Sequence, residues 1–302
     1  MLFHANVRAQ NYPTKPVRIV TSQPGGSSDF VARVVAQGLI GPLGQQVIVD
    51  NRVAIIAIET VAKAPPDGYT LLVMSNLLWM LPLLQSTSFD AVKDFLPVSL
   101  AAMSPNILVV HPSVPVKSVK ELIALARAKP GEMNYATSGT GASNHLAAEL
   151  FKAMAGINIV RINYKGGGPL LTAMLSGEVH MSFASAGAVV PHLKAGRLRA
   201  LAVTSAHPSA LLPGLPSVAK TVPGYETVAM YGVFAPAGTL SAIIGRLNQA
   251  IARFLSTPEA KERFLSSGAE AVGDSASDFA AAIRSDLSKM TRIIKQAHIR
   301  AE

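Results

Sequence analysis

Short apolar runs rich in β-branched residues alternate along the chain with longer segments whose apolar positions recur at helical spacing. The runs that predict strands are residues 17–22, 46–50, 70–75, 107–111, 134–137, 159–163, 181–184, 200–204 and 228–235. The periodic segments that predict helices are residues 29–39, 118–128, 143–154, 169–176, 241–255, 258–266 and 277–297. Strands that alternate with helices of this length predict βαβ units, and hence an α/β fold with mostly parallel sheets.

Two segments of this pattern, near residues 101–105 and 224–230, are placed as connections between two lobes would be. A chain of 302 residues exceeds one typical core and suffices for two domains. We therefore predict a discontinuous first domain of residues 11–104 plus 231–302, and a continuous second domain of residues 105–230. A chain that leaves a domain and later returns forms a two-stranded hinge, which is typical of proteins that close around a ligand.

Composition narrows the classes of partner. Hydrophobic residues make up 49% of the chain, which permits a sizeable core and argues against disorder. The net charge is +9, but Lys and Arg are scattered rather than clustered with aromatic residues, so nucleic acid is not an expected partner. The positive charge remains compatible with small anions. Cysteine is absent, which excludes disulfides and thiolate metal sites, and no apolar run approaches the roughly 20 residues of a membrane span.

The first ten residues carry neither the basic start nor the apolar stretch of a complete export signal. Three interpretations stay open. The signal of an exported protein is truncated or removed, the start of the chain is misassigned, or the segment is a disordered cytoplasmic tail.

Three predicted strand-to-helix junctions are rich in glycine and small hydroxyl residues: residues 23–29, 138–145 and 164–169. Glycine lets the backbone approach a ligand closely, and a helix N-terminus carries about half a positive charge. Such junctions are ready anion sites, and in parallel α/β sheets they gather at the carboxyl ends of the strands. None matches the P-loop or the Gly-x-Gly-x-x-Gly fingerprint, so we predict a site for a small carboxylate rather than a nucleotide.

Three side chains of these junctions have two interpretations each. Asp29 either contacts the ligand or holds the Pro-Gly-Gly loop in shape, and we favour the structural role. His145 either has a functional role, as a ligand contact or a general base, or has a structural role as a side chain hydrogen-bonded within a helix start. Lys165 either pairs with a carboxylate or is solvated. The chain has neither a Gly-x-Ser-x-Gly elbow nor a His-Glu-x-x-His motif, so we predict no catalytic residue, no metal and no cofactor.

Nine segments in this order resemble one family closely. They are residues 12–18 (Tyr-Pro-Thr-Lys-Pro-Val-Arg), 24–29 (Pro-Gly-Gly-Ser-Ser-Asp), 62–70 (Ala-Lys-Ala-Pro-Pro-Asp-Gly-Tyr-Thr), 92–95 (Val-Lys-Asp-Phe), 112–115 (Pro-Ser-Val-Pro), 138–145, 164–166 (Tyr-Lys-Gly), 195–204 (Ala-Gly-Arg-Leu-Arg-Ala-Leu-Ala-Val-Thr) and 234–239 (Phe-Ala-Pro-Ala-Gly-Thr). Together they resemble the Bug/TctC receptors, the substrate-binding family of tripartite tricarboxylate transporters.

The resemblance implies a two-lobed, periplasmic-binding-protein-like (Venus flytrap) fold with two crossover connections. It implies a monomeric periplasmic receptor that binds a small organic or amino acid by its carboxylate and delivers it to a two-component membrane permease. A sensor without a transport role, or an enzyme on the same scaffold, is the alternative. The ligand-binding residues predicted are Gln23, Gly25, Gly26, Ser27, Asp29, Asn76 and Tyr231 in the first domain, and Ser138, Gly139, Thr140, Gly141, Ser143, His145, Lys165, Gly166 and Ser185 in the second.

Two stretches depart from the family pattern. Residues 53–60 replace a glycine-rich segment, and residues 76–82 (Asn-Leu-Leu-Trp-Met-Leu-Pro) replace a polar loop after the third strand. Trp79 has two interpretations. Either it faces the ligand, which would favour monocarboxylates with an apolar tail over dicarboxylates, or the apolar side chains around it turn inwards and fill the core.

Overall fold

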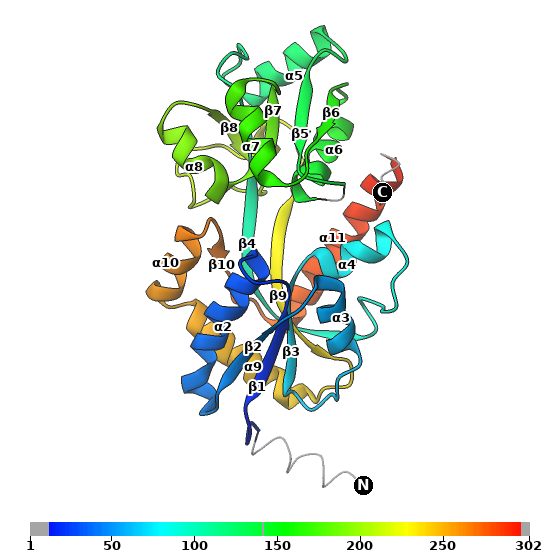
Figure 1. Ribbon diagram of the computed structural model, residues 1–302, viewed down its shortest axis with the longest axis vertical. Helices are drawn as coiled ribbons and strands as arrows, with labels where there is room; N and C mark the ends of the chain where they lie inside the picture. The colour runs from blue at the N-terminus through cyan, green and yellow to red at the C-terminus, as the bar shows by residue number, and fades with distance from the viewer. Residues whose placement is uncertain (1–11, 141, 297–302) are drawn as a thin grey trace. The chain divides into compact units, whose positions relative to one another are not determined.

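The computed structural model describes residues 12–140 and 142–296 and has the α/β architecture that the alternating pattern predicts (Figure 1). The strands are β1 (Val17–Thr21), β2 (Val47–Asn51), β3 (Thr70–Ser75), β4 (Phe95–Val110), β5 (Asn134–Thr137), β6 (Val160–Asn163), β7 (Met181–Ser185), β8 (Arg199–Val203), β9 (Val228–Pro236) and β10 (Glu270–Ala271). The helices are α2 (Ser27–Leu43), α3 (Ala54–Ala62), α4 (Leu77–Leu84), α5 (Val119–Ala128), α6 (Ser143–Ala155), α7 (Gly167–Ser176), α8 (Ala186–Lys194), α9 (Ser241–Leu255), α10 (Pro258–Ser266) and α11 (Ala276–Gln296), with a 3₁₀ turn η1 (Val218–Lys220).

The chain divides into two compact units. Of the described residues, unit 1 contains residues 12–103 together with Met230–Phe264 and Ala271–Ser288, and unit 2 contains Ser104–Ala229, Leu265–Glu270 and residues 289–296. The strands β4 and β9 each run through a boundary between units. The domain bounds predicted from the sequence stay a proposal. The division into units differs from them mainly in placing Leu265–Glu270 and residues 289–296 in the second unit.

In unit 1 the sheet follows the order β2-β1-β3-β9, with β4 next to β9. The strands β1, β2 and β3 are parallel, whereas β9 is antiparallel to β3. Helix α2 packs on these parallel strands and on α9, and its close approach to α9 depends on Gly38. A Cβ at Gly38 would lie 2.2 Å from the ring of Phe254, so a side chain there would collide with α9.

In unit 2 the sheet follows the order β4-β7-β5-β6, and β8 pairs with β4. The strands β5, β6 and β7 are parallel to one another, and β4 is antiparallel to β7 and β8. Apolar side chains of β4, α7 and α8 form a core; its members include Ile107, Val109, Leu170, Met174 and Val189. A second group of packed side chains is aromatic and consists of Phe151, Phe183 and Tyr225. The Tyr225 hydroxyl donates to the carbonyl of Ala147.

The two stretches that depart from the family pattern are helices rather than loops. Residues 53–60 lie mostly in α3, and residues 76–82 lie mostly in α4. Trp79 is 1% exposed, its indole N–H donates to Asp286 Oδ2 over 2.8 Å, and its ring meets Phe234 and Phe279 edge-on. The interpretation in which these side chains fill the core is therefore correct, and Trp79 does not face a ligand. The preference for apolar monocarboxylates was predicted from a Trp79 that faces the ligand, so the structure does not support that prediction.

Candidate functional site

In unit 2 three strands end at one edge of the sheet, and each is followed by a helix start. The strands β5, β6 and β7 are parallel, so Thr137, Asn163 and Ser185 mark the same edge. Helices α6, α7 and α8 begin just beyond, and none has a side-chain hydrogen bond that caps its N-terminus. Because the first N–H groups of a helix have no partner within it, this edge carries unsatisfied donors from three helices, together with their positive dipole ends.

The loop between β5 and α6 contains the predicted residues Ser138, Gly139, Thr140 and Ser143, whereas Gly141 lies outside the described residues. Asn144 holds this loop: its Oδ1 accepts from the Ser138 N–H over 3.3 Å, and its Nδ2 donates to Ser138 Oγ over 3.0 Å. Gly139 has a φ of 148°, a conformation that favours glycine. Ser143 is exposed, whereas Ser138, Gly139 and Thr140 are half-buried.

The loop between β6 and α7 is tied to the first one. The Gly166 N–H donates to the carbonyl of Ser138 over 3.3 Å, so two predicted anion loops lie side by side. Gly166 has a φ of 97° and lies at the N-cap of α7, and no atom lies within 4 Å of the Cβ position of Gly166, Gly167 or Gly168. A ligand can therefore approach this backbone without displacing a side chain. Lys165 is exposed beside it, and no carboxylate of the described residues pairs with it.

Arg161 is a half-buried cation that the sequence reasoning did not identify. It lies on β6, and its Nε donates to Thr137 Oγ1 over 3.1 Å while its Nη2 donates to Thr140 Oγ1 over 2.8 Å. The guanidinium therefore reaches from the strand to the loop between β5 and α6. A charged residue between Val160 and Ile162, three positions before the Tyr-Lys-Gly segment, was the available signal.

Two further predicted residues of unit 2 have specific positions. His145 is 3% exposed on the first turn of α6, so the structural interpretation is favoured over a ligand contact. Ser185 is exposed at the N-cap of α8 and pairs in register with Asn106 of β4. At the first turn of α8 one close contact is present, because a Cβ at Gly268 would lie 2.8 Å from the backbone nitrogen of Gly187.

In unit 1 the loop between β1 and α2 contains Gln23, Gly25, Gly26 and Ser27, all exposed. Asp29 shapes it: Oδ2 accepts from the Gly25 N–H over 2.9 Å, and Oδ1 accepts from Asn51 Nδ2 over 2.8 Å and from Arg33 Nε over 2.9 Å.

The Asp29 carboxylate is 4% exposed, and its hydrogen bonds decide its charge. Burial alone would raise the pKa of Asp29, but the hydrogen bonds from Asn51, the Gly25 amide and Arg33 outweigh it and lower that pKa. Gly25 has a φ of 81°, and its amide is turned inwards to the carboxylate. In the structure Asp29 holds the loop in shape, as the favoured interpretation expects, and its contact with a ligand stays a prediction.

The other predicted residues of unit 1 gather at the same sheet edge. Tyr231 pairs in register with Ser75 at the end of β3, next to Asn76, which is the N-cap residue of α4. Burial raises the pKa of Tyr231, and a hydrogen bond with Ser27 opposes this shift. The Asn76 side chain makes no hydrogen bond to another described residue, although its carbonyl accepts from the N–H groups of Trp79 and Met80.

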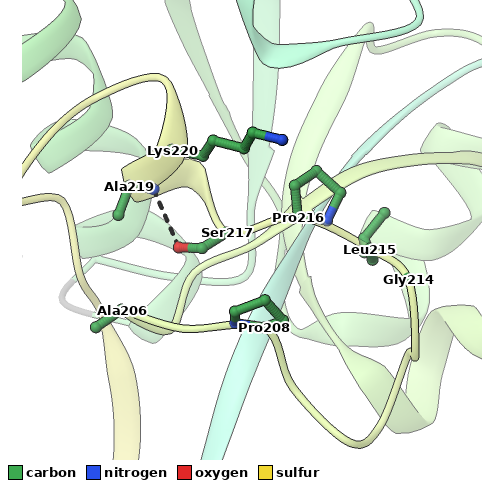
Figure 2. Close-up of a pocket in the computed structure, with 8 residues that line it drawn as sticks. All are labelled: Ala206, Pro208, Gly214, Leu215, Pro216, Ser217, Ala219 and Lys220. Atoms are coloured by element: carbon green, nitrogen blue, oxygen red, sulfur yellow. Dashed lines mark hydrogen bonds between the residues drawn. The ribbon is translucent and has the colours of Figure 1, made fainter.

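A cavity of about 650 Å³ opens elsewhere in unit 2, around the segment that follows β8 (Figure 2). Its lining is Ala206, Pro208, Gly214, Leu215, Pro216, Ser217, Ala219 and Lys220, none of them a predicted site residue. The lining is largely apolar, and the Ser217 hydroxyl is engaged with the Ala219 N–H and the Ser205 carbonyl. Lys220 is the one charged residue of this lining, and none of the three glycine-rich junctions contributes to it, so we do not assign the site to this cavity.

Within residues 12–140 and 142–296, no three His, Asp or Glu side chains converge as a metal centre would require. In the same part of the chain, no helix combines the length and apolarity needed to cross a membrane.

Comparison with known proteins gives concordant matches. A family model described as "Tripartite tricarboxylate transporter family receptor" matches residues 31–299. Protein BugT of Bordetella pertussis is 38% identical over 276 residues, which is 89% of this chain and 85% of BugT. The structure of R. palustris Rpa4515 with adipate is 36% identical with a TM-score of 0.79, covering 96% of this chain and all of that one. MatC of Rhodopseudomonas palustris with bound malate is 25% identical with a TM-score of 0.72, covering 94% of this chain and all of MatC.

Proposed function

The chain belongs to the tripartite tricarboxylate transporter receptor family, and from that premise we propose that it is a periplasmic receptor for a small carboxylate. It shares the two-lobed fold of those receptors. Its ligand passes unchanged to the membrane components of a transporter. The ligand is a small organic acid of the class to which adipate and malate belong, because structural relatives carry those two acids.

One observation carries the proposal: the uncapped starts of α6 and α7 at one edge of the unit 2 sheet. Their loops are tied together by the Gly166–Ser138 hydrogen bond, and open space lies over the backbone from Gly166 to Gly168. A carboxylate accepts several N–H hydrogen bonds at once, and helix dipoles favour its negative charge. Ser138, Gly139, Thr140, Gly141, Ser143, Lys165, Gly166 and Ser185 are the binding residues that we propose in unit 2.

Unit 1 supplies a second set of polar groups. Gln23, Gly25, Gly26 and Ser27 form an exposed loop, and the Asp29 carboxylate preorganises it. Ser27, Asn76 and Tyr231 add side-chain donors near the same edge of that unit's sheet. We propose these groups as the ligand-binding residues of unit 1, while Asp29 and His145 act by shaping the loops of their own units.

No catalytic step is part of this proposal. The polar groups described above are hydrogen-bond donors and loop anchors rather than a nucleophile with its base. The family itself is one of receptors.

The proposal is tested by thermal unfolding in the presence of adipate, malate and the neutral diamide adipamide. A ligand at 100 times its Kd stabilises the folded protein by about 2.7 kcal/mol, which raises Tm by about 5 °C for a chain of this size. We expect at least one of the acids to raise Tm by this amount and adipamide to raise it by much less. If neither acid raises Tm, or if adipamide raises it by the same amount as the acids, carboxylate recognition is refuted.

A further inference from the structure

Arg161 combines a full positive charge with a fixed position at the proposed binding edge of unit 2. Its Nε and Nη2 hydrogen bonds to Thr137 and Thr140 anchor the guanidinium to the end of β5 and to the following loop. The Thr137 hydroxyl donates in turn to Asn163 Oδ1 over 3.1 Å. The hydroxyl therefore presents a lone pair to Arg161. The orientation of the guanidinium is set by the fold rather than by solvent.

The charge of Arg161 has no anionic partner in the described part of the chain, because none of the ion pairs there includes it. The carboxylate on the neighbouring helix α6, Glu149, is engaged by Lys152 over 3.0 Å and by the Tyr135 hydroxyl. Tyr135 is the register partner of Arg161 on β5. Both hydroxyls that accept from Arg161 are neutral. A half-buried guanidinium is rarely held by neutral groups alone, because burying a charge without a counter-charge is costly.

The hydrogen bonds of Arg161 leave one side of the guanidinium open. The Nε and Nη2 donors that face the two threonines form one edge of the planar group. The other edge, formed by Nη1 and the second Nη2 hydrogen, makes no hydrogen bond to residues 12–140 or 142–296. Two parallel N–H groups of this kind match the two oxygens of a carboxylate in a bidentate pair.

We infer that Arg161 is the charged contact for the ligand carboxylate in unit 2 and that it sets selectivity for acids over neutral analogues. The inference rests on the proposed function and adds to it the residue that distinguishes a charged ligand from a neutral one. Backbone N–H groups of α6 and α7 can donate to any group with lone pairs, including an amide oxygen. A guanidinium in bidentate contact gains most from a carboxylate. Thr137 and Thr140 are positioning residues in this arrangement.

Isothermal titration calorimetry tests the inference with adipate, malate and adipamide on the wild type, Arg161→Gln, Arg161→Lys and Thr137→Val. Arg161→Gln is expected to weaken binding of the preferred acid by about 30-fold or more, as loss of a hydrogen-bonded charge partner does. Arg161→Lys keeps the charge without the planar guanidinium, and its affinity for the acid is expected to lie between those of the wild type and Arg161→Gln. Thr137→Val conserves volume and is expected to weaken acid binding less than Arg161→Gln does.

The matched control is Arg197→Gln, which removes one exposed charge of the same unit and is expected to bind like the wild type. Selectivity separates a charge contact from a structural role. Loss of the preference for the acid over adipamide in Arg161→Gln supports the inference, whereas equal weakening of both ligands overturns it. Acid binding by Arg161→Gln that equals the wild type also overturns it and leaves the proposed function intact. If the wild type binds neither acid, the proposed function is refuted and the Arg161 inference falls with it.

Discussion

Replacing Asp29 with Asn tests whether one buried carboxylate holds the loop between β1 and α2. The carboxylate accepts from three donors, the Gly25 N–H, Asn51 and Arg33. An Asn side chain has one acceptor oxygen, so its NH₂ group must face at least one of these donors. The orientation that keeps Asn51 and Arg33 bonded turns the NH₂ towards the Gly25 N–H and releases the loop.

The magnitude follows from the bonds lost. A hydrogen bond to a charged group contributes about 1.5–3 kcal/mol, so Asp29→Asn is expected to lower the free energy of unfolding by about 2–3 kcal/mol at pH 7. Affinity for the preferred acid should fall as well, because the Gly25–Ser27 backbone is no longer preorganised. Urea unfolding measures the first effect and calorimetry the second. Glu259→Gln is the control: Glu259 is exposed, its contact with Arg263 is a surface pair, and its loss should cost less than 1 kcal/mol.

The stabilisation by Asp29 depends on pH. Because the pKa of Asp29 is lowered in the folded protein, its stabilisation is present above the unfolded-state pKa of about 3.9 and is lost as pH falls towards the folded value. The difference between wild type and Asp29→Asn should therefore be constant from about pH 5 to pH 8 and shrink below about pH 4. Equal urea midpoints for Asp29→Asn and Glu259→Gln at pH 7, or a difference that does not shrink below about pH 4, would refute the reasoning.

Three further predictions concern packing and the second loop. Gly38→Ala should destabilise unit 1 by about 1–3 kcal/mol, because its Cβ meets the Phe254 ring. Gly245→Ala on α9 is the control: open space surrounds this position, so the change should be neutral or stabilise by up to about 1 kcal/mol. Equal urea midpoints for the two variants would contradict this. Trp79→Phe removes the indole donor to Asp286 and should lower Tm without changing acid affinity, and altered selectivity in calorimetry would return Trp79 to the site. Asn144→Ala frees Ser138 and should weaken acid binding about tenfold, whereas the exposed Asn158→Ala should bind normally; equal affinity of the two would show that the Ser138 contacts do not shape the loop.

Periodicity predicted most elements because strands and helices impose different spacings on apolar residues. The limits of α9 and α10 and of β3 and β5 agree with the predicted ranges. Helices α3 and α4 were missed for physical reasons. Their apolar residues form nearly continuous runs without helical spacing, and Pro82 within α4 is a residue that usually interrupts a helix.

Side-chain direction was less predictable than backbone structure. The buried position of Trp79 depends on Asp286, which is 207 positions away, and no local pattern reports such a contact. Arg161 reaches Thr140 only because the loop after β5 turns back towards β6. The assignment of Leu265–Glu270 to unit 2 depends on long-range contacts of the same kind, such as the Glu270 carboxylate with the Ser209 hydroxyl and the Ala210 N–H.

The buried indole of Trp79 determines what ultraviolet fluorescence can report about this protein. Trp79 is the one tryptophan in the sequence and lies in unit 1, so native tryptophan emission originates there and should be blue-shifted. Ligand contacts confined to unit 2 should leave that emission unchanged, and a silent titration would say nothing about binding at α6 and α7. During unfolding the same emission follows unit 1, whereas far-ultraviolet circular dichroism follows both units. A gap between the two midpoints would reveal that the units unfold separately.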